Sequence, residues 1–467
     1  MIYQKAINLA PTYADALCNL GICLSLQEKY EDAEVLYKKA LAINPGELEI
    51  IFYLADSYYG LGKYREARNL LLPHIKEHSP LNRADVLNLI GKTFQKEGSA
   101  DALQYYRKAL FFSDKTDESL NNIGSFLYEK RKVQLSIKFF NDAIRSNEGN
   151  SNVEINLAYA YLILGNFKEG WEKHEYRWKV DPLNKVRWPI EGRDLWEGQQ
   201  DRDVVLWREQ GIGDELIFLG LVPEARACCK KVSVYIDERL IPLCERSMPD
   251  VRFLSKPEQI GEREFDYHLP MGSLPRLFRS SEEDFQKTVK SYLKADLDRV
   301  EVLRRDLNVG DRKIIGISWK SIKSLNHLKK SLTLTEFGKI FQGLDIVLLN
   351  LQYGEVDEEI KAFERDTGIE IIQCSSVDNR EDLDGLAALI ELCDLVVSTS
   401  NVTIHLAGAL GKETWVLLPY VANFWWLLER TDSVWYPSLT LYRQKKLKDW
   451  DSIAIELAED LKKKFNT

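Results

Sequence analysis

Small residues recur through the first third of the chain at intervals of about one helix pair. Gly21, Ala55, Gly91, Gly124 and Ala158 are separated by 34, 36, 33 and 34 positions. Twelve positions after four of them the chain again carries small residues, namely Ala33, Ala67, Ser136 and Gly170. Because paired helices approach closely only where side chains are small, this period predicts a stack of helix pairs.

The pattern resembles the tetratricopeptide repeat (TPR), which places small residues, a Gly-x-Tyr/Phe turn and Pro at these phases. Gly62-Lys63-Tyr64 and Gly165-Asn166-Phe167 match that turn. We expect a TPR α-solenoid over residues 1–183, with about four repeats plus a partial one at the N-terminus. The resemblance implies a concave groove that binds an extended peptide or a partner protein. A purely structural spacer is the alternative.

The fifth unit departs from the repeat, because bulky aromatic residues stand where earlier units keep small ones. Its segment 170–178 reads Gly-Trp-Glu-Lys-His-Glu-Tyr-Arg-Trp and contains Trp171, the first of the 11 Trp in the chain. We interpret this segment as a cap that docks the array onto the C-terminal part of the chain.

Charge and cysteine usage narrow the class of protein. The 467 residues include 63 basic and 72 acidic side chains, and the net charge of −9 disfavours binding to nucleic acid. Seven scattered cysteines are typical of reduced thiols, and no metal site is expected. The most apolar window, Thr414 to Leu428, is interrupted by Pro419 and Asn423, so we expect no membrane span and no signal peptide. A cytoplasmic, multidomain protein is expected.

From Asp203 onward, short β-rich runs alternate with helical patterns, as parallel sheets covered by helices require. Eight runs are expected to be strands: Val204–Trp207, Val232–Ile236, Val251–Leu254, Ile314–Trp319, Ile346–Gln352, Ile369–Gln373, Leu395–Thr399 and Thr414–Leu418. A charged stretch from about Glu282 to Asn308 predicts a helix. We therefore expect two Rossmann-like lobes, 184–309 and 310–467, with a closing helix at the C-terminal end. Open sheets bind ligands at the carboxyl ends of their strands, so the site is expected between the lobes.

The first of three candidate site segments runs from Trp207 to Leu216, where a strand turns into a helix. It reads Trp-Arg-Glu-Gln-Gly-Ile-Gly-Asp-Glu-Leu. Its two glycines let the backbone approach a ligand closely, and Asp214 stands in the first turn of the helix. A dinucleotide fingerprint would need a third glycine at Leu216, which argues against a nicotinamide or flavin cofactor. A plain tight turn is the alternative.

The other two segments follow strands of the second lobe. Residues 317–332 form a polar loop with four Lys and one His, which suggests an anionic ligand; a solvated basic loop is the alternative. In residues 394–412 an apolar strand runs into polar capping residues and a helix of small residues, whose N–H groups suit a phosphate. Ordinary N-capping by Ser400 or Asn401 explains the same residues. His405, one turn inside this helix, is either a core histidine or a ligand contact.

Three motifs in this order resemble those of bacterial glycosyltransferases of the two-lobed GT-B fold, especially the ADP-heptose heptosyltransferase-like group. The motifs are Gln-Gly-Ile-Gly-Asp, Ser-Trp-Lys…Lys-Lys-Ser-Leu and Ser-Asn-Val-Thr-Ile-His-Leu-Ala-Gly-Ala-Leu-Gly-Lys. With its array, the chain looks like bacterial TPR-containing glycosyltransferases that modify proteins, and is distantly similar to O-linked N-acetylglucosamine transferases and flagellin glycosyltransferases. The heptosyltransferase-like group usually has Asp-Thr-Gly where this chain has Ser400-Asn401-Val402. The carboxylate contact to the donor is therefore not expected here.

The resemblance implies a role for each segment. Asp214 matches the position of the catalytic base that takes the proton of the acceptor hydroxyl; a helix-start carboxylate without that role is the alternative. Residues implied to bind the donor diphosphate are Lys320, Lys330, Ser400, Asn401, Val402 and Thr403. Further possible donor or acceptor contacts are Arg208, Gln210, Gly211, Gly213, Lys323, His327, His405 and Trp425. For Trp425, a hydrophobic seam that joins the lobes is the favoured alternative.

We therefore expect a metal-independent glycosyltransferase that moves a sugar from a nucleotide-sugar donor to a hydroxyl of a protein acceptor recruited by the array. No cofactor is expected besides the nucleotide-sugar substrate. One alternative keeps the transferase but makes the acceptor a glycan or lipid-linked saccharide. The other is a non-catalytic TPR scaffold with a decayed transferase region.

Overall fold

The computed structural model describes residues 2–75, 83–113, 116–180, 193–261, 264–287, 290–321 and 332–465. The chain divides into two compact units, Met1–Ala160 and Tyr161–Thr467. The expected domain boundaries at 183/184 and 309/310 stay predictions.

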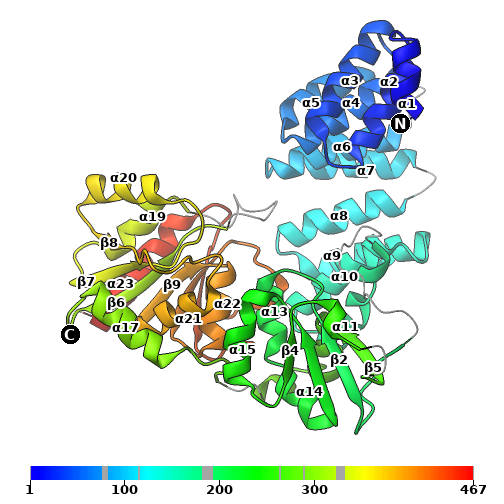
Figure 1. The fold of residues 1–467 in the computed structure, drawn as a ribbon. Coiled ribbons are helices and arrows are strands. Elements are labelled where there is room, and N and C mark those ends of the chain that lie inside the picture. Colours follow the sequence, from blue (N-terminus) through cyan, green and yellow to red (C-terminus); the bar gives the residue numbers. More distant parts are fainter. Residues whose placement is uncertain are drawn as a thin grey trace. The chain divides into compact units, whose positions relative to one another are not determined.

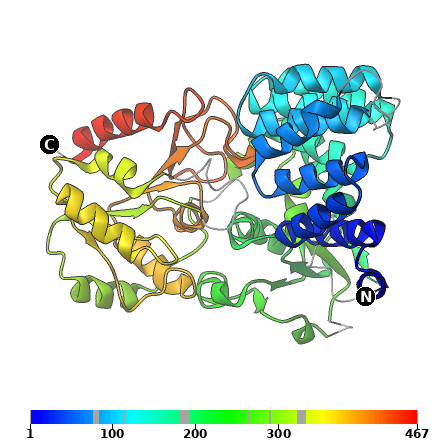
Figure 2. The same cartoon turned by 90° about the horizontal axis from the view of Figure 1, so that it is seen from above.

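The first unit is a stack of helices, coloured blue to cyan in Figures 1 and 2. Its helices are α1 (Ile2–Leu9), α2 (Ala14–Ser25), α3 (Tyr30–Ile43), α4 (Leu48–Gly60), α5 (Tyr64–Leu71), α6 (Arg83–Lys96), α7 (Ala102–Phe112), α8 (Asp117–Glu129), α9 (Val133–Ser146) and α10 (Ser151–Ile163), the last of which crosses into the second unit. From α2 to α9, consecutive helices pack as pairs. The predicted TPR-like solenoid is confirmed.

The small residues of the repeat pattern let an aromatic ring of the next helix sit against the backbone. Gly91 of α6 faces the buried ring of Tyr106 in α7, and a Cβ built on Gly91 would lie 2.5 Å from that ring. Gly124 makes the same contact with Phe140. The sequence period of about 34 residues therefore reflects a packing contact that recurs between paired helices.

The second unit contains two parallel sheets. The first has the order β1-β5-β2-β3-β4 and the second β11-β10-β9-β6-β7-β8. The strands are β1 (Asp194–Leu195), β2 (Asp203–Trp207), β3 (Lys231–Tyr235), β4 (Arg252–Leu254), β5 (Tyr267–Pro270), β6 (Lys313–Ser318), β7 (Ile346–Asn350), β8 (Ile371–Ile372), β9 (Leu395–Thr399), β10 (Thr414–Leu418) and β11 (Leu439–Arg443). The central strands are buried on both faces, which explains their continuous apolar runs. The expected α plus α/β class is confirmed.

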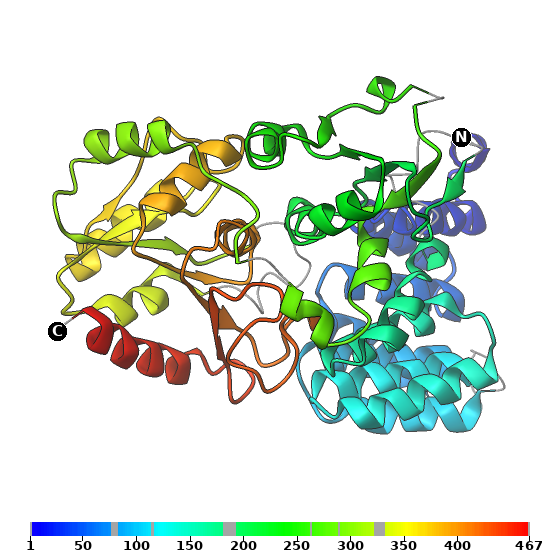
Figure 3. The same cartoon turned by 90° about the horizontal axis from the view of Figure 1, so that it is seen from below.

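Helices cover both faces of the second sheet (Figure 3). Helices α19 (Leu334–Gly338), α20 (Asp357–Thr367) and α23 (Trp450–Phe465) share a hydrophobic core with one face. Helix α21 (Leu383–Leu392) connects β8 to β9 and so crosses the switch in strand order, and α22 (Val402–Ala409) connects β9 to β10. The main helices that precede the second sheet are α11 (Phe167–His174), α12 (Arg177–Val180), α13 (Ile212–Leu219), α14 (Val222–Cys228), α15 (Ile241–Ser247), α16 (Leu274–Phe278) and α17 (Leu297–Leu307).

All eight expected strands are present, but three were not expected. Strand β1 has only two residues, β5 contains His268 and ends at Pro270, and β11 alternates apolar with polar residues, so none forms an apolar run. The helix expected from Glu282 to Asn308 is wrong in its first half, because the described part of that half holds only a short 3-10 turn and an extended segment. That segment is held by the N–H groups of Tyr292 and Leu293, which donate to the carbonyl of Ala409. Helix α17 packs on α21, which groups it with the second sheet.

The contact between Gly91 and Tyr106 gives a test of the array. Gly91→Val inserts carbon where the fully buried ring leaves no space, so we expect overpacking to destabilise the array by about 2 kcal/mol. Hydrogen exchange measured in α6 and α7 of the full chain should accelerate. Lys39→Ala, on an exposed helix surface, should stay within about 0.5 kcal/mol of the wild type. Equal exchange in Gly91→Val and wild type would contradict the proposed contact.

Candidate functional site

The second and third sequence segments meet at one point of the second sheet. Open α/β sheets bind ligands at the carboxyl ends of the strands where the strand order reverses, which here is between β6 and β9. Nδ2 of Asn401, after β9, donates to Oγ of Ser318 at 2.7 Å and to the carbonyl of Lys320 at 3.3 Å. The loops after β6 and β9 therefore form one site.

The predicted diphosphate-binding residues at the start of α22 differ in how much surface they offer. Asn401 is the N-cap, and its Oδ1 accepts the N–H of Thr403 at 3.0 Å. Both side chains are buried in the lobe. Ser400 and Val402 are half-buried, and Oγ of Ser400 accepts a hydrogen bond from Nε1 of Trp426 at 3.0 Å. Among these four residues, Ser400 and Val402 keep side-chain surface that a ligand can reach.

Lys320 follows β6 and lies next to an acidic partner. Its Nζ is 2.5 Å from Oε2 of Glu359 in α20, and its backbone N–H donates to Oε1 of Gln352 at 2.9 Å. A phosphate at this place would share Lys320 with Glu359. The other predicted contacts of this loop, Lys323, His327 and Lys330, lie outside the described residues.

The first candidate segment, Trp207 to Leu216, meets the third, residues 394–412, where α13 packs beside α22 (Figure 1). Gly213 stands against His405, since a Cβ built on Gly213 would lie 3.3 Å from Cδ2 and 3.8 Å from Nε2 of the imidazole. Gly211 is the N-cap of α13, and the half-buried Asp214 lies in its first turn. The structure thus brings the loop of Asp214 to His405, on different lobes.

Arg208, another predicted contact, is paired with carboxylates of its own lobe. Its Nη2 lies 2.9 Å from Oε1 of Glu215, and its Nη1 lies 3.2 Å from Oδ2 of Asp237. Burial raises the pKa of Glu215 to about 7, and the charge of Arg208 only partly offsets that effect. Gln210, in the same loop, is half-buried. The roles predicted for Arg208 and Gln210 stay predictions.

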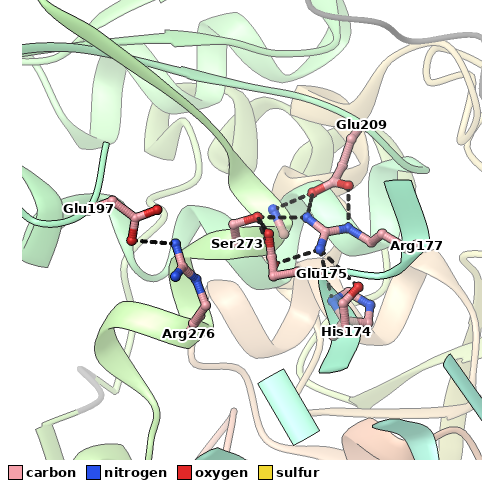
Figure 4. Close-up of polar contacts among 8 residues, drawn as sticks. His174, Glu175, Arg177, Glu197, Glu209, Ser273 and Arg276 are labelled. Atoms are coloured by element: carbon pink, nitrogen blue, oxygen red, sulfur yellow. Dashed lines mark hydrogen bonds and ion pairs between the residues drawn. The ribbon is translucent and has the colours of Figure 1, made fainter. Parts of the chain in front are cut away.

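The corresponding position of the first sheet, between β2 and β5, holds a side chain of the protein itself (Figure 4). Nε and Nη2 of Arg177 donate to the two carboxylate oxygens of Glu209 at 2.7 and 2.9 Å. Nη2 also donates to Oγ of Ser273 at 2.8 Å, and Nη1 donates to Oε1 of Glu175 at 2.7 Å. Because Glu209 follows β2 and Ser273 follows β5, the guanidinium bridges the ends of both strands.

Neighbouring groups pack closely around this buried ion pair. The N–H of Gly272 donates to Oε1 of Glu209 at 2.7 Å, and a Cβ on Gly272 would collide with that oxygen. The rings of Trp178 and Trp207 pack with centroids 5.4 Å apart, and Arg177 is 7% exposed. The place where the first sheet would bind a ligand is therefore filled by the segment that follows α11.

Trp425 belongs to a buried aromatic cluster. Its ring centroid lies 5.8 Å from Trp171 of α11, 5.6 Å from Phe218 of α13 and 5.4 Å from Trp435. The cluster joins the segment after the array, the first lobe and the C-terminal tail. The seam expected as the alternative for Trp425 is present, and the cap expected at residues 170–178 packs on it.

A cavity of about 610 Å³ lies at the carboxyl ends of β7 and β8. Its lining includes Asn350, Gln352, Tyr353, Gln373, Ser375 and Asn379. Gln352 links this cavity to the loop after β6, because its Oε1 accepts the N–H groups of Trp319 and Lys320 at 3.0 and 2.9 Å. The lining also carries four carboxylates and one guanidinium, those of Glu355, Asp357, Asp378, Glu381 and Arg380. Together with the amide groups and the ring of Tyr353, it suits a polar, uncharged group more than an anionic one.

Sequence reasoning missed the cavity and Arg177. The polar runs after the expected strands at Ile346–Gln352 and Ile369–Gln373 were a usable signal, because they stand at carboxyl strand ends like the two loops that were singled out. Arg177 gave no such signal, since its partners Glu209 and Ser273 lie 32 and 96 positions away.

Among the described helices, none is both long and apolar enough to cross a membrane. Within the same residues, no group of three or more His, Cys, Asp or Glu side chains is arranged to hold a metal ion.

A family model agrees with the array, and several known proteins are similar to parts or most of this chain. The family model described as "Tetratricopeptide repeat" matches residues 14–47. Protein FlbA of Caulobacter vibrioides is 26% identical over 473 residues, which cover 96% of this chain and 78% of FlbA. BBSome complex member BBS4 of Bos taurus is 32% identical over 125 residues, 26% of this chain and 23% of that protein, so the chain matches about a quarter of it. A solved thermophilic TPR protein of Thermus thermophilus has 16% identity and a TM-score of 0.34, covering 37% of this chain and 93% of its own.

The ion pair of Arg177 and Glu209 can be tested by stability. Arg177→Met leaves the carboxylate of Glu209 buried without its partner, so we expect a loss of about 3–5 kcal/mol in the unfolding free energy of the second unit. All tryptophans lie in that unit, so their fluorescence during urea unfolding reports it. The double variant Arg177→Met with Glu209→Gln should recover part of the loss. A double variant as unstable as the sum of both single variants would argue against a paired charge.

The raised pKa of Glu215 predicts a pH dependence of stability. Glu215 remains protonated up to about pH 7 when folded, whereas it ionises near its ordinary pKa of 4.5 when unfolded. The raised pKa therefore adds to the unfolding free energy. This addition is fully present below pH 4.5 and is lost as the pH rises through 7, by up to about 3 kcal/mol. Glu215→Gln should therefore flatten the pH profile of urea unfolding between these values, whereas the exposed Glu238→Gln should not. A wild-type-like slope in Glu215→Gln would refute the assignment.

Proposed function

We propose that this protein is a glycosyltransferase that moves a sugar from a nucleotide-sugar donor to a hydroxyl of a protein acceptor. The observation that supports this most is the contact of the Gly213 loop with His405. It brings the loop that carries Asp214, a half-buried carboxylate of one lobe, next to α22, the helix that begins after the strand-order reversal of the other. A group-transfer site needs a base and a leaving-group seat on facing sides, and these residues offer both.

The donor binds to the second lobe in this proposal. The cavity beside β7 and β8 takes the nucleoside, and Gln352 leads from there to Lys320 and the start of α22. The N–H groups at the N-terminus of α22, together with Lys320, offset the negative charge that develops on the diphosphate. The first lobe does not compete for the donor, because Arg177 fills its equivalent position.

Asp214 acts as the base. Its carboxylate accepts the proton of the acceptor hydroxyl while that oxygen forms a bond to the anomeric carbon of the sugar. The bond from that carbon to the diphosphate oxygen breaks, and the electron pair leaves with the nucleoside diphosphate. Charge is conserved, since the proton stays on Asp214 until it passes to solvent.

The array recruits the acceptor. TPR arrays use their concave surface for protein partners, and this supports a protein as the molecule that carries the hydroxyl.

Asp214→Asn separates chemistry from binding. The amide keeps the shape of the side chain but cannot take a proton, so we expect transfer to fall by about 10²–10⁴ fold while nucleoside diphosphate affinity changes less than about twofold. Transfer is measured as release of UDP, GDP, ADP or CMP from the matching nucleotide sugars, with acceptor protein present. Asp250→Asn, an exposed carboxylate of the same lobe, is the control.

Unchanged turnover in Asp214→Asn would remove Asp214 from the mechanism. Binding of none of these nucleotides by the wild type would favour the scaffold without transferase activity. Transfer to a saccharide but to no protein would favour the glycan acceptor.

A further inference from the structure

One side of the helix stack is lined by every second helix. Helices α2, α4, α6 and α8, which we call the inner row, pack against one another more closely than α3, α5, α7 and α9, the outer row, do within the described residues. Hydrogen bonds also join the inner row, because Oγ of Ser119 in α8 donates to Oδ1 of Asn88 in α6 at 3.2 Å. The Oγ atoms of Ser25 in α2 and Ser57 in α4 lie 3.3 Å apart. Since a curved stack is tighter on its inner side, the inner row forms the concave face of the array.

The two rows differ in the sign of their charge. The four helices of the inner row contain seven acidic and three basic residues. The four helices of the outer row contain eight basic and five acidic residues. Within these eight helices, negative charge is therefore concentrated on the concave side and positive charge on the convex side.

The acidic residues of the inner row recur with the repeat. Four of them stand six positions before the small residue that marks their repeat, in the first turns of the inner helices, namely Asp15, Glu49, Asp85 and Glu118. A carboxylate in a first turn also suits the helix dipole. Asp56 does not have that explanation, because it lies seven positions after Glu49, beyond the first turn of α4. Residues seven positions apart share one side of a helix, so Asp56 extends the same negative face.

Three of these carboxylates have no cation beside them. Asp15, Glu49 and Asp56 form no ion pair in the part of the chain that the structure describes, and all three keep exposed surface. On the outer row, by contrast, the two carboxylate oxygens of Glu34 each lie 2.6 Å from the Nζ of a lysine. The concave face thus keeps negative charge that the array itself does not neutralise.

A buried amide of the inner row also lacks a partner. Asn122 in α8 is 8% exposed, and its Nδ2 has no hydrogen-bond acceptor among the described residues. It lies four positions after Glu118 and three before Ser125, so these side chains share one side of the helix. Glu118 lies 2.8 Å from Nζ of Lys92 in α6, which shows that this side faces the next inner helix. A buried donor without an acceptor is unfavourable, and the carbonyl of a chain bound along the inner row would supply one.

These groups select a partner by its chemistry. Lysine and arginine side chains supply the cations that the carboxylates lack, and an extended backbone supplies carbonyl acceptors. We propose that the inner row binds an extended, basic segment of a partner protein. The inference rests on the proposed function only where it makes that protein the acceptor of the sugar, since the docking itself needs no transferase activity.

Peptide binding to the full chain tests the docking without any sugar donor. Three labelled peptides of equal length carry lysine, glutamine or glutamate at the same positions of a Gly/Ser background, and fluorescence anisotropy measures their affinities. We expect the lysine peptide to bind about tenfold or more tightly than the other two. The triple variant Asp15→Asn, Glu49→Gln and Asp56→Asn should lose about tenfold in affinity for it, because the attracting charges are gone.

A matched variant separates this face from the negative charge of the whole chain. Glu31→Gln, Asp32→Asn and Glu66→Gln remove the same charge from exposed positions of the outer row and should change the affinity by less than about twofold. In the wild type, added salt should weaken binding of the lysine peptide and leave the glutamine peptide unaffected, which tests the charges without a substitution.

Equal losses in the two triple variants would overturn the inference, because the attraction would then come from net charge alone. Tighter binding of the glutamine or glutamate peptide, or binding of none of the three, would overturn it as well. A wild type that selects the lysine peptide but binds no nucleotide would keep the docking surface and reject the proposed transferase. Nucleotide binding without selection among the peptides would keep the transferase and reject the basic partner.

Discussion

The ion pair of Arg177 and Glu209 determines how the second unit can be used. Two parallel sheets of similar design offer two places for a ligand, and Arg177 fills one of them with a bidentate, buried contact. Taking these charges out of water is costly, and the cost is offset only because Ser273, Glu175 and the N–H of Gly272 complete the hydrogen bonds. The loop of Gly211 to Asp214, in the same lobe, lies outside this ion pair and belongs to the start of α13, which packs beside α22.

The second lobe has the complementary arrangement. Its strand-order reversal is lined by Ser318, Lys320 and Asn401, and a polar cavity continues from it toward β8. The aromatic cluster around Trp171 and Trp425 ties both lobes to the segment that leaves the array. The two lobes are therefore joined by apolar packing in one region and by α13 against α22 in another, with Gly213 and His405 in contact.

Local patterns in the sequence predicted the parts of the fold that depend on local packing. The 34-residue period anticipated the contacts of Gly91 and Gly124 with aromatic rings, and apolar runs anticipated eight strands. The loop after β9 was recognised, but its spacing could not tell that Asn401 and Thr403 turn inward while Ser400 meets Trp426. Long-range contacts were also out of reach: the pairing of Arg177 with Glu209 has no local signal. The polar ends of β7 and β8 were readable and were overlooked.

The central claim is that the second lobe alone binds the nucleotide. Hydrogen–deuterium exchange of the full chain with and without UDP, GDP, ADP or CMP tests it most directly. For the nucleotide that binds, the account predicts added protection in residues 350–357, 373–381 and 399–405. Protection centred instead on residues 208–211 and 270–273 of the first lobe, or no protection with any of the four, would contradict it.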